Sequence, residues 1–190
     1  PLAVAGQSAA NQVFNSAFWI TSFLPSVTAT LISKENASGN KEGVRNAVNQ
    51  ALFVGMSISL ISSVLMFLNP DKVLSSVLGA NAPAMEFARP YLLIRSFAFL
   101  PSLISLVGFS AFRGILETDT PVKVSLFANI FNAILDPILI FGYGPFPEMG
   151  IKGAAVATVI SYISIMIVGL WLLGKRERML TSNWPGITKI

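Results

Sequence analysis

The sequence predicts an all-α integral membrane protein with about five transmembrane helices. Hydrophobic residues make up 53% of the chain, charged residues make up only 12%, and the mean hydropathy is +0.67. A water-soluble domain carries roughly 25% charged residues. Because so few charges cannot cover a 190-residue globule in water, most of the surface must face lipid or other apolar helices.

Five apolar stretches are long enough to cross a bilayer, since a helix that spans a hydrocarbon core of about 30 Å needs about 20 residues. Each stretch is bounded by Gly, Pro, Asn or charged residues, which mark helix ends. Helices of a soluble bundle would each need a polar face, and the second and fifth stretches offer only Ser, Thr, Asn and Gln there. The expected spans are residues 9–32, 47–68, 90–112, 122–143 and 150–174.

The basic residues predict the orientation of these spans. If the spans alternate in direction, nine basic residues lie on one side of the membrane and three lie on the other. Because cytoplasmic loops are enriched in Lys and Arg, the richer side should be cytoplasmic, so that the chain enters from outside and ends inside. The first group is Lys34, Lys41, Arg45, Arg113, Lys123, Lys175, Arg176, Arg178 and Lys189, and the second is Lys72, Arg89 and Lys152.

Composition also limits the chemistry. The chain has no Cys and no His, which removes disulfides, thiolate chemistry and the commonest metal ligands, and we expect no cofactor. The pI of about 9.6 would suit nucleic acid binding. The basic residues fall between apolar stretches, however, so we interpret them as topology signals and expect no nucleic acid partner.

Polar residues in the first and third spans are candidates for the lining of a cavity. Asn11, Asn15 and Ser22 lie at helical spacing, and they either line a polar cavity or hydrogen-bond to neighbouring helices. Tyr91 is either a cavity lid or a member of the aromatic belt at the membrane interface, and the residue alone favours the belt. Arg95 should snorkel towards the outer interface, because it lies only about one and a half turns inside its span.

The fourth span contains Asp136, the only carboxylate well inside an apolar stretch. An aspartate near the centre of a membrane helix costs roughly 2.5–3.5 kcal/mol on insertion scales. Asn132 and Asn129 precede it by about one and two turns and share its helical face. Pro137 removes the N–H that would bond the carbonyl of Ala133. A freed carbonyl beside a carboxylate and an amide is a candidate site for a cation or a proton.

Asp136 has structural interpretations as well. An Asp-Pro pair often starts a helix, so Asp136 could restart a kinked helix, or it could pair with Arg95. The functional interpretation is favoured because acids retained inside membrane helices usually face a cavity. With this one acid in place of a carboxylate pair, hydrolysis lacks its usual groups, and we expect no enzyme.

The fifth span begins with small residues. Gly153 and Ala157 lie four residues apart, which permits close approach of a neighbouring helix. Thr158 could add a hydroxyl to a cavity, although such residues more often bond to their own backbone.

Three features between residues 112 and 161 together carry a resemblance to a known family. They are a turn with Arg113, Gly114, Asp119, Thr120 and Pro121, a run with Asn129, Asn132, Asp136 and Pro137, and the segment GIKGAAVATVIS from Gly150. This pattern resembles the multidrug and toxic-compound extrusion (MATE) transporters, and it is most similar to the branch of bacterial damage-inducible members and plant organic-acid exporters.

The resemblance implies two pseudo-symmetric six-helix lobes that enclose a cavity open to alternate sides of the membrane. It implies export of organic cations, other xenobiotics or organic acids in exchange for H⁺ or Na⁺. Residues 1–174 would be helices two to six of the first lobe, and residues 175–190 a basic cytoplasmic tail or a linker between lobes. Asp136 and Asn132 would bind the coupling ion, and the cavity would be lined by Asn129, Tyr91, Thr158 and Asn15.

Under this interpretation the partners are a small organic substrate, the bilayer of a cell or an organelle, and a second lobe. The first helix and the second lobe of the family lie outside the sequence, so we expect that this chain alone does not transport. One alternative is a flippase for lipid-linked precursors from the same superfamily, which would need several basic residues in its cavity, where only Arg95 qualifies. Another is a membrane assembly subunit that does not transport, in which Asp136 would only kink its helix.

Overall fold

The described residues form a bundle of apolar helices, as the sequence predicts. A computed structural model describes residues 2–79 and 81–175. In this part of the chain the helices are α1 (Leu2–Ile20), α2 (Phe23–Ala37), α3 (Lys41–Leu68), α4 (Pro70–Leu74), α5 (Met85–Ser96), α6 (Phe99–Gly114), α7 (Asp119–Phe141) and α8 (Ile151–Lys175).

By length and composition, the described helices provide four candidate membrane spans, or five if a bent pair of helices forms one span. Four are α1 with α2, then α3, α7 and α8, and the remaining span is the pair α5 and α6, which bends by 48° at a short break. The expected all-α membrane fold with about five spans is therefore confirmed, and the bounds of the individual spans stay a prediction. The boundaries differ most where helices continue beyond the apolar stretch: α3 begins at Lys41 because the Asn40 side chain caps it, accepting a bond from the Gly43 N–H at 3.0 Å.

Two spans are interrupted one turn before a proline. Between α1 and α2, the Leu24 N–H bonds the Thr21 carbonyl at 3.2 Å. Pro25, the next residue, has no N–H with which to continue the α-helical pattern to that carbonyl. The same relation holds in the third span, where the break between α5 and α6 lies four residues before Pro101. The apolar stretches predict two continuous spans here, so neither break is predicted.

The third span also begins earlier than expected. We predicted its start at Pro90, but α5 begins at Met85 and Pro90 lies in its second turn. The bound of the span itself stays a prediction, and the helix extends past Pro90 because a proline can also sit inside a helix at the loss of one backbone hydrogen bond.

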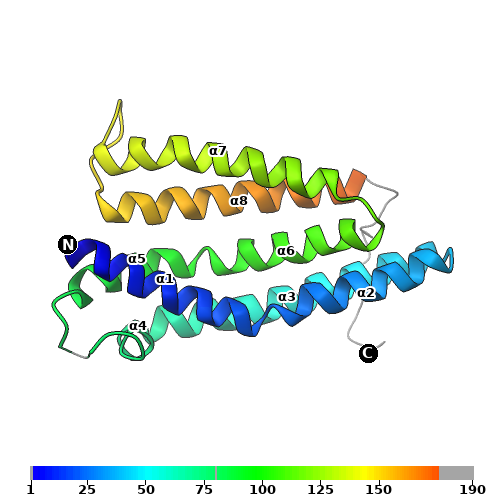
Figure 1. Ribbon diagram of the computed structural model, residues 1–190, viewed down its shortest axis with the longest axis horizontal. Coiled ribbons are helices and arrows are strands. Elements are labelled where there is room, and N and C mark those ends of the chain that lie inside the picture. The colour runs from blue at the N-terminus through cyan, green and yellow to red at the C-terminus, as the bar shows by residue number, and fades with distance from the viewer. Residues whose placement is uncertain (1, 80, 176–190) are drawn as a thin grey trace.

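The spans lie side by side along one long axis (Figure 1). Consecutive helices α7 and α8 form an antiparallel pair, and α8 also packs against α5 and α6, which in turn contact α1, α2 and α3. Most of the buried apolar side chains belong to the helices below the α7–α8 pair in Figure 1. Helix α7 buries only Pro121, Val124, Ala128 and Leu139, so most of its surface is uncovered by the described residues.

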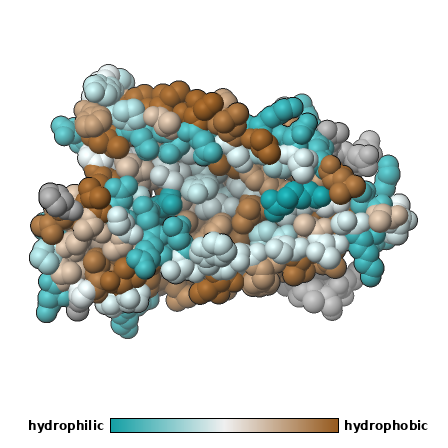
Figure 2. Space-filling model, in the orientation of Figure 1, coloured by the Kyte–Doolittle hydropathy of each residue, from teal (hydrophilic) through white to brown (hydrophobic). Residues whose placement is uncertain are grey.

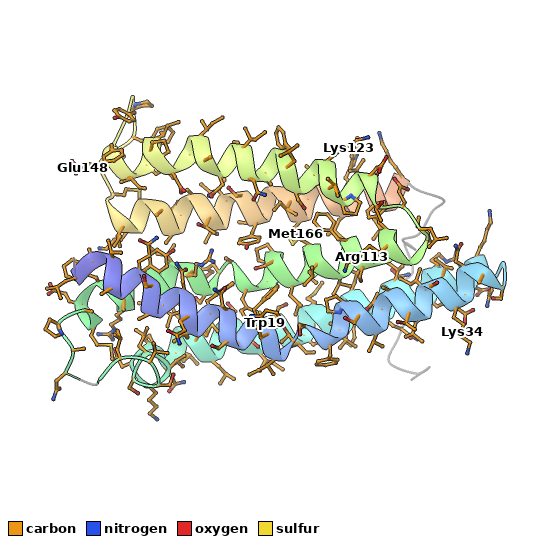
Figure 3. The ribbon with its side chains drawn as sticks, in the orientation of Figure 1. Trp19, Lys34, Arg113, Lys123, Glu148 and Met166 are labelled. Carbon is orange, nitrogen blue, oxygen red and sulfur yellow. The ribbon has the colours of Figure 1, made fainter. Side chains whose placement is uncertain are left out.

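Most of the described charged residues lie at the two ends of the bundle, and Arg95 and Asp136 are exceptions. Lys34, Arg113 and Lys123 lie at one end, and Glu148 lies at the other (Figure 3). At the Glu148 end, Arg89 pairs with Asp71 at 3.5 Å between two exposed side chains. Three of the basic residues counted in the orientation argument, Arg176, Arg178 and Lys189, lie outside the described residues, as does nearly all of the predicted basic tail.

Candidate functional site

The polar residues of α7 lie on a continuous helix. It runs through Pro137 without a break and ends at Gly142, whose φ of 70° places it in the left-handed conformation typical of a helix end. Asp136 therefore lies inside a helix and does not cap a restarted one, which removes the N-cap interpretation. The helix accommodates Pro137 near its end, where the loss of one backbone bond is small beside the packing of α7 on α8.

Asp136 and Asn132 lie one turn apart on α7, and each keeps an unsatisfied polar atom. Both residues are partly buried. The Asp136 Oδ1 and the Asn132 Nδ2 atoms are fully buried, and neither has a hydrogen-bond partner among the described residues. A buried acceptor and a buried donor without partners are costly. This arrangement can bind an ion or a proton, because a carboxylate oxygen is available to it.

The remaining predicted cavity residues are spread over three helices. Asn129, one turn before Asn132, is exposed on α7, and Asn15 is exposed on α1. Thr158 on α8 is partly buried, and its hydroxyl donates to the Ala154 carbonyl at 2.9 Å. Figure 2 shows hydrophilic residues over α1 and over the part of α7 and α8 that faces it.

Tyr91 is buried, which corrects the interfacial interpretation. Its side chain is 2% exposed, and its hydroxyl donates to the Asn11 Oδ1 atom on α1 at 3.2 Å. The ring belongs to a buried cluster that includes Ala10 of α1 and Ala155 of α8. A polar bond thus joins the first and third spans inside the bundle. Helical spacing places Asn11 on a polar face, but it does not predict this partner.

Arg95 is buried as well, and the prediction that it snorkels to the interface is wrong. The residue is 8% exposed, and its guanidinium carbon lies 4.4 Å from the ring centroid of Phe14 and 5.8 Å from that of Tyr162. Its Nε and Nη1 atoms have no hydrogen-bond partner in the described part of the chain. Arg95 follows Tyr91 by one turn, so the packing of α5 against α1 and α8 buries both.

A groove on another part of the bundle is apolar and contains none of the predicted site residues. It has a volume of about 620 Å³ and lies between α3, the break of the third span and α8. Met166, one of its lining residues, lies between α8 and α6 (Figure 3). Apart from Ser63 and Ser96, its lining is hydrophobic, so it can accept an apolar group but offers no site for a cation.

Comparison with known families and curated proteins gives a consistent result. The sequence model of the family described as MatE matches residues 1–138. The FAD transporter of Shewanella oneidensis is 33% identical over 79% of this chain and 32% of its own length. The probable multidrug resistance protein NorM of Thermotoga maritima is 30% identical over 92% of this chain and 38% of its own length. The chain thus spans about a third of the curated relatives that it matches.

Solved structures share the fold. A transporter of the MOP superfamily from Pyrococcus furiosus superposes with a TM-score of 0.84 at 23% identity, over 99% of this chain and 42% of that chain. An outward-facing conformation of a multidrug resistance MATE family transporter gives a TM-score of 0.81, and an inward-facing one gives 0.74, at 21% and 22% identity. These cover 99% and 98% of this chain, and 42% and 40% of those chains.

Proposed function

The chain belongs to the multidrug and toxic-compound extrusion family of membrane transporters, and from this premise we propose that it forms part of a cation-coupled exporter with its coupling-ion site at Asp136 and Asn132. The proposal is supported by one observation above all. Inside an apolar, continuous helix, the Asp136 Oδ1 and Asn132 Nδ2 atoms are buried one turn apart, without partners among the described residues.

The coupling step follows from the chemistry of this pair. An ionised Asp136 can accept a hydrogen bond from the Asn132 amide, or it can bind Na⁺ through its oxygens. A proton or Na⁺ on the carboxylate changes that bond and neutralises the charge on α7. The two ionic states therefore interact differently with the surroundings of α7, and this difference shifts the equilibrium between inward-open and outward-open conformations.

The substrate is proposed to be a small organic molecule, either a cation or an organic acid. The relatives carry names that refer to FAD transport and to multidrug resistance. Asn129 and Asn15 are exposed on α7 and α1, and they supply neutral hydrogen-bonding groups that suit either class. Because α7 is largely uncovered, we propose that a second lobe of the transporter faces it and completes the cavity.

The test uses the full-length transporter in proteoliposomes, with the variants Asp136→Asn and Asp119→Asn. Asp119 lies on the same helix but is exposed in its first turn, so it controls for the loss of a carboxylate on α7. Efflux of ethidium and of citrate is driven by an imposed pH gradient or Na⁺ gradient. We expect Asp136→Asn to lose gradient-driven efflux, while Asp119→Asn keeps it.

The two gradients identify the coupling ion. Efflux that responds to the pH gradient alone indicates H⁺, and efflux that responds to the Na⁺ gradient alone indicates Na⁺. Wild-type coupling in Asp136→Asn would refute the assignment of the site. Coupling lost equally in both variants would show that the acid on α7 acts through charge in general and not through its position.

A further inference from the structure

Arg95 is a buried cation whose hydrogen-bonding needs are not met by the described residues. The side chain is more than nine-tenths buried, and its Nε and Nη1 atoms lack acceptors. A charged group taken out of water and left unpaired is strongly destabilising, so buried guanidinium groups are normally paired. Its role is not explained by the coupling-ion site on α7.

The carbonyl groups nearest to Arg95 along α5 already accept other donors. The Leu93 carbonyl accepts the Ser96 hydroxyl at 2.8 Å, and the Ser96 carbonyl accepts the Ser63 hydroxyl at 2.7 Å. At the break, the Phe97 N–H donates to the Ile94 carbonyl, and the Ala98 N–H donates to the carbonyl of Arg95 itself. The end of α5 favours a positive charge through its dipole, but these carbonyls do not bond the guanidinium.

The other neighbours of Arg95 hold it in place without supplying an acceptor. Phe14 and Tyr162 lie within cation–π distance of the guanidinium. One turn before Arg95, the hydroxyl of Tyr91 donates to the Asn11 Oδ1 atom, which leaves the Asn11 amide N–H groups as donors. None of these contacts gives the guanidinium an anionic partner, and an oxyanion is its complementary ligand.

No carboxylate in the described part of the chain fills this role. The described acids other than Asp136 lie in the first or last turns of helices or in the connections between them. Asp136 lies on α7, and its buried Oδ1 atom has no hydrogen-bond partner among the described residues. The described acids therefore leave the Nε and Nη1 atoms of Arg95 without an anionic partner.

We propose that Arg95 is the anchor of an oxyanion site between α1, α5 and α8, which takes a carboxylate or a phosphate group. The guanidinium presents a planar fork of N–H groups that matches both groups in two-point geometry. The oxyanion is supplied either by a small anionic molecule or by a carboxylate side chain of the transporter outside the described residues. The inference does not require Asp136 to be the coupling-ion site.

The test measures anion binding and thermal stability in the purified full-length transporter at constant ionic strength. Citrate and inorganic phosphate are the probes, and isothermal titration gives Kd. The variants are Arg95→Gln, Arg95→Lys and Arg113→Gln. Arg113 lies on the same span but is exposed in the last turn of α6, so its variant controls for the loss of one positive charge.

With a small anion as the ligand, wild type and Arg113→Gln bind a probe equally. Arg95→Gln weakens that binding at least about tenfold through loss of the charge-assisted bonds, and Arg95→Lys keeps part of the affinity. With a carboxylate of the protein as the ligand, the wild type binds neither probe. In that case Arg95→Gln lowers Tm because it leaves that carboxylate unpaired, whereas Arg95→Lys retains more of the stability.

A truly unpaired Arg95 gives a different result. Replacing it by Gln then removes a desolvated charge, so Tm stays the same or rises while probe binding does not change, and this outcome would overturn the proposal. If Arg95→Gln does not fold, Arg95→Lys decides, because unchanged Tm and unchanged probe binding in that variant would exclude a two-point guanidinium contact. Loss of coupling in Asp136→Asn with intact probe binding would separate this site from the proposed coupling function.

Discussion

At the scale of single residues, the hydrogen bond between Tyr91 and Asn11 links the first and third spans. The bond is 3.2 Å long and the ring of Tyr91 is buried. We expect Tyr91→Phe to reduce stability by about 1 kcal/mol, because it removes one hydrogen bond but keeps the packing of the ring. A double-mutant cycle with Asn11→Ala, measured as changes in Tm of the full-length protein, should show that the two effects do not add. Additive effects would mean that the bond does not form in the membrane protein.

The residue scale also shows what the sequence could and could not predict about the site. Asp136 and Asn132 were predicted as neighbours because their relation depends only on helical spacing. The burial of Arg95 depends on Phe14 and Tyr162, and that of Tyr91 depends on residues of α1 and α8, all of which are distant in the sequence. In a membrane helix both lipid and protein favour apolar side chains, so hydrophobic periodicity does not show which face of α5 turns inward.

At the scale of helices, the close packing of α7 against α8 depends on Gly153. A Cβ at this position would collide with the carbonyl oxygen of Leu139 on α7. We expect Gly153→Ala to separate the two helices and to reduce stability by about 1–3 kcal/mol, the usual range for overpacking. The control is Gly169→Ala on the same helix, where the added Cβ would lie 3.5 Å from a ring atom of Phe109, an ordinary contact. Equal Tm values for both variants would contradict the close packing of this pair.

The prolines show that the sequence does not predict where a helix breaks. Pro25 and Pro101 follow breaks in their spans, whereas Pro137 lies within a continuous α7. The missing N–H is the same in all three cases, so the local chemistry alone does not decide the outcome. A helix breaks where the surrounding helices support the bend, and that support depends on tertiary packing, which the sequence pattern does not reveal.

The five spans were predictable at the scale of the whole molecule, because hydropathy is averaged over some 20 residues and tolerates errors at single positions. The pairing of α7 with α8 was also within reach, since a short connection joins consecutive helices. Contacts of α1 with α5 and of α6 with α8 join helices far apart in the chain, and no local pattern specifies them. The prediction therefore gave the number of spans but not the packing that positions Tyr91 and Arg95.

The last prediction concerns the whole molecule and gives the orientation of the bundle in the membrane. Because this chain contains no Cys, single introduced cysteines can be labelled to test that orientation. Ser38 is exposed between α2 and α3, at the end that contains most of the basic residues, and Glu148 is exposed at the opposite end. Because Lys and Arg favour the cytoplasmic side, Ser38→Cys should resist a membrane-impermeant maleimide in intact cells, and Glu148→Cys should react.

Permeabilised cells provide the control for this labelling experiment, since both cysteines should then react, and any native cysteines elsewhere in the full-length transporter are first replaced. The reverse labelling pattern in intact cells would show that the bundle has the opposite orientation in the membrane. In that orientation, the Glu148 end of α7 would face the cytoplasm, and Asp136, which lies nearer to that end, would be reached more directly from inside. The direction in which the coupling ion approaches its site therefore depends on the outcome of this measurement.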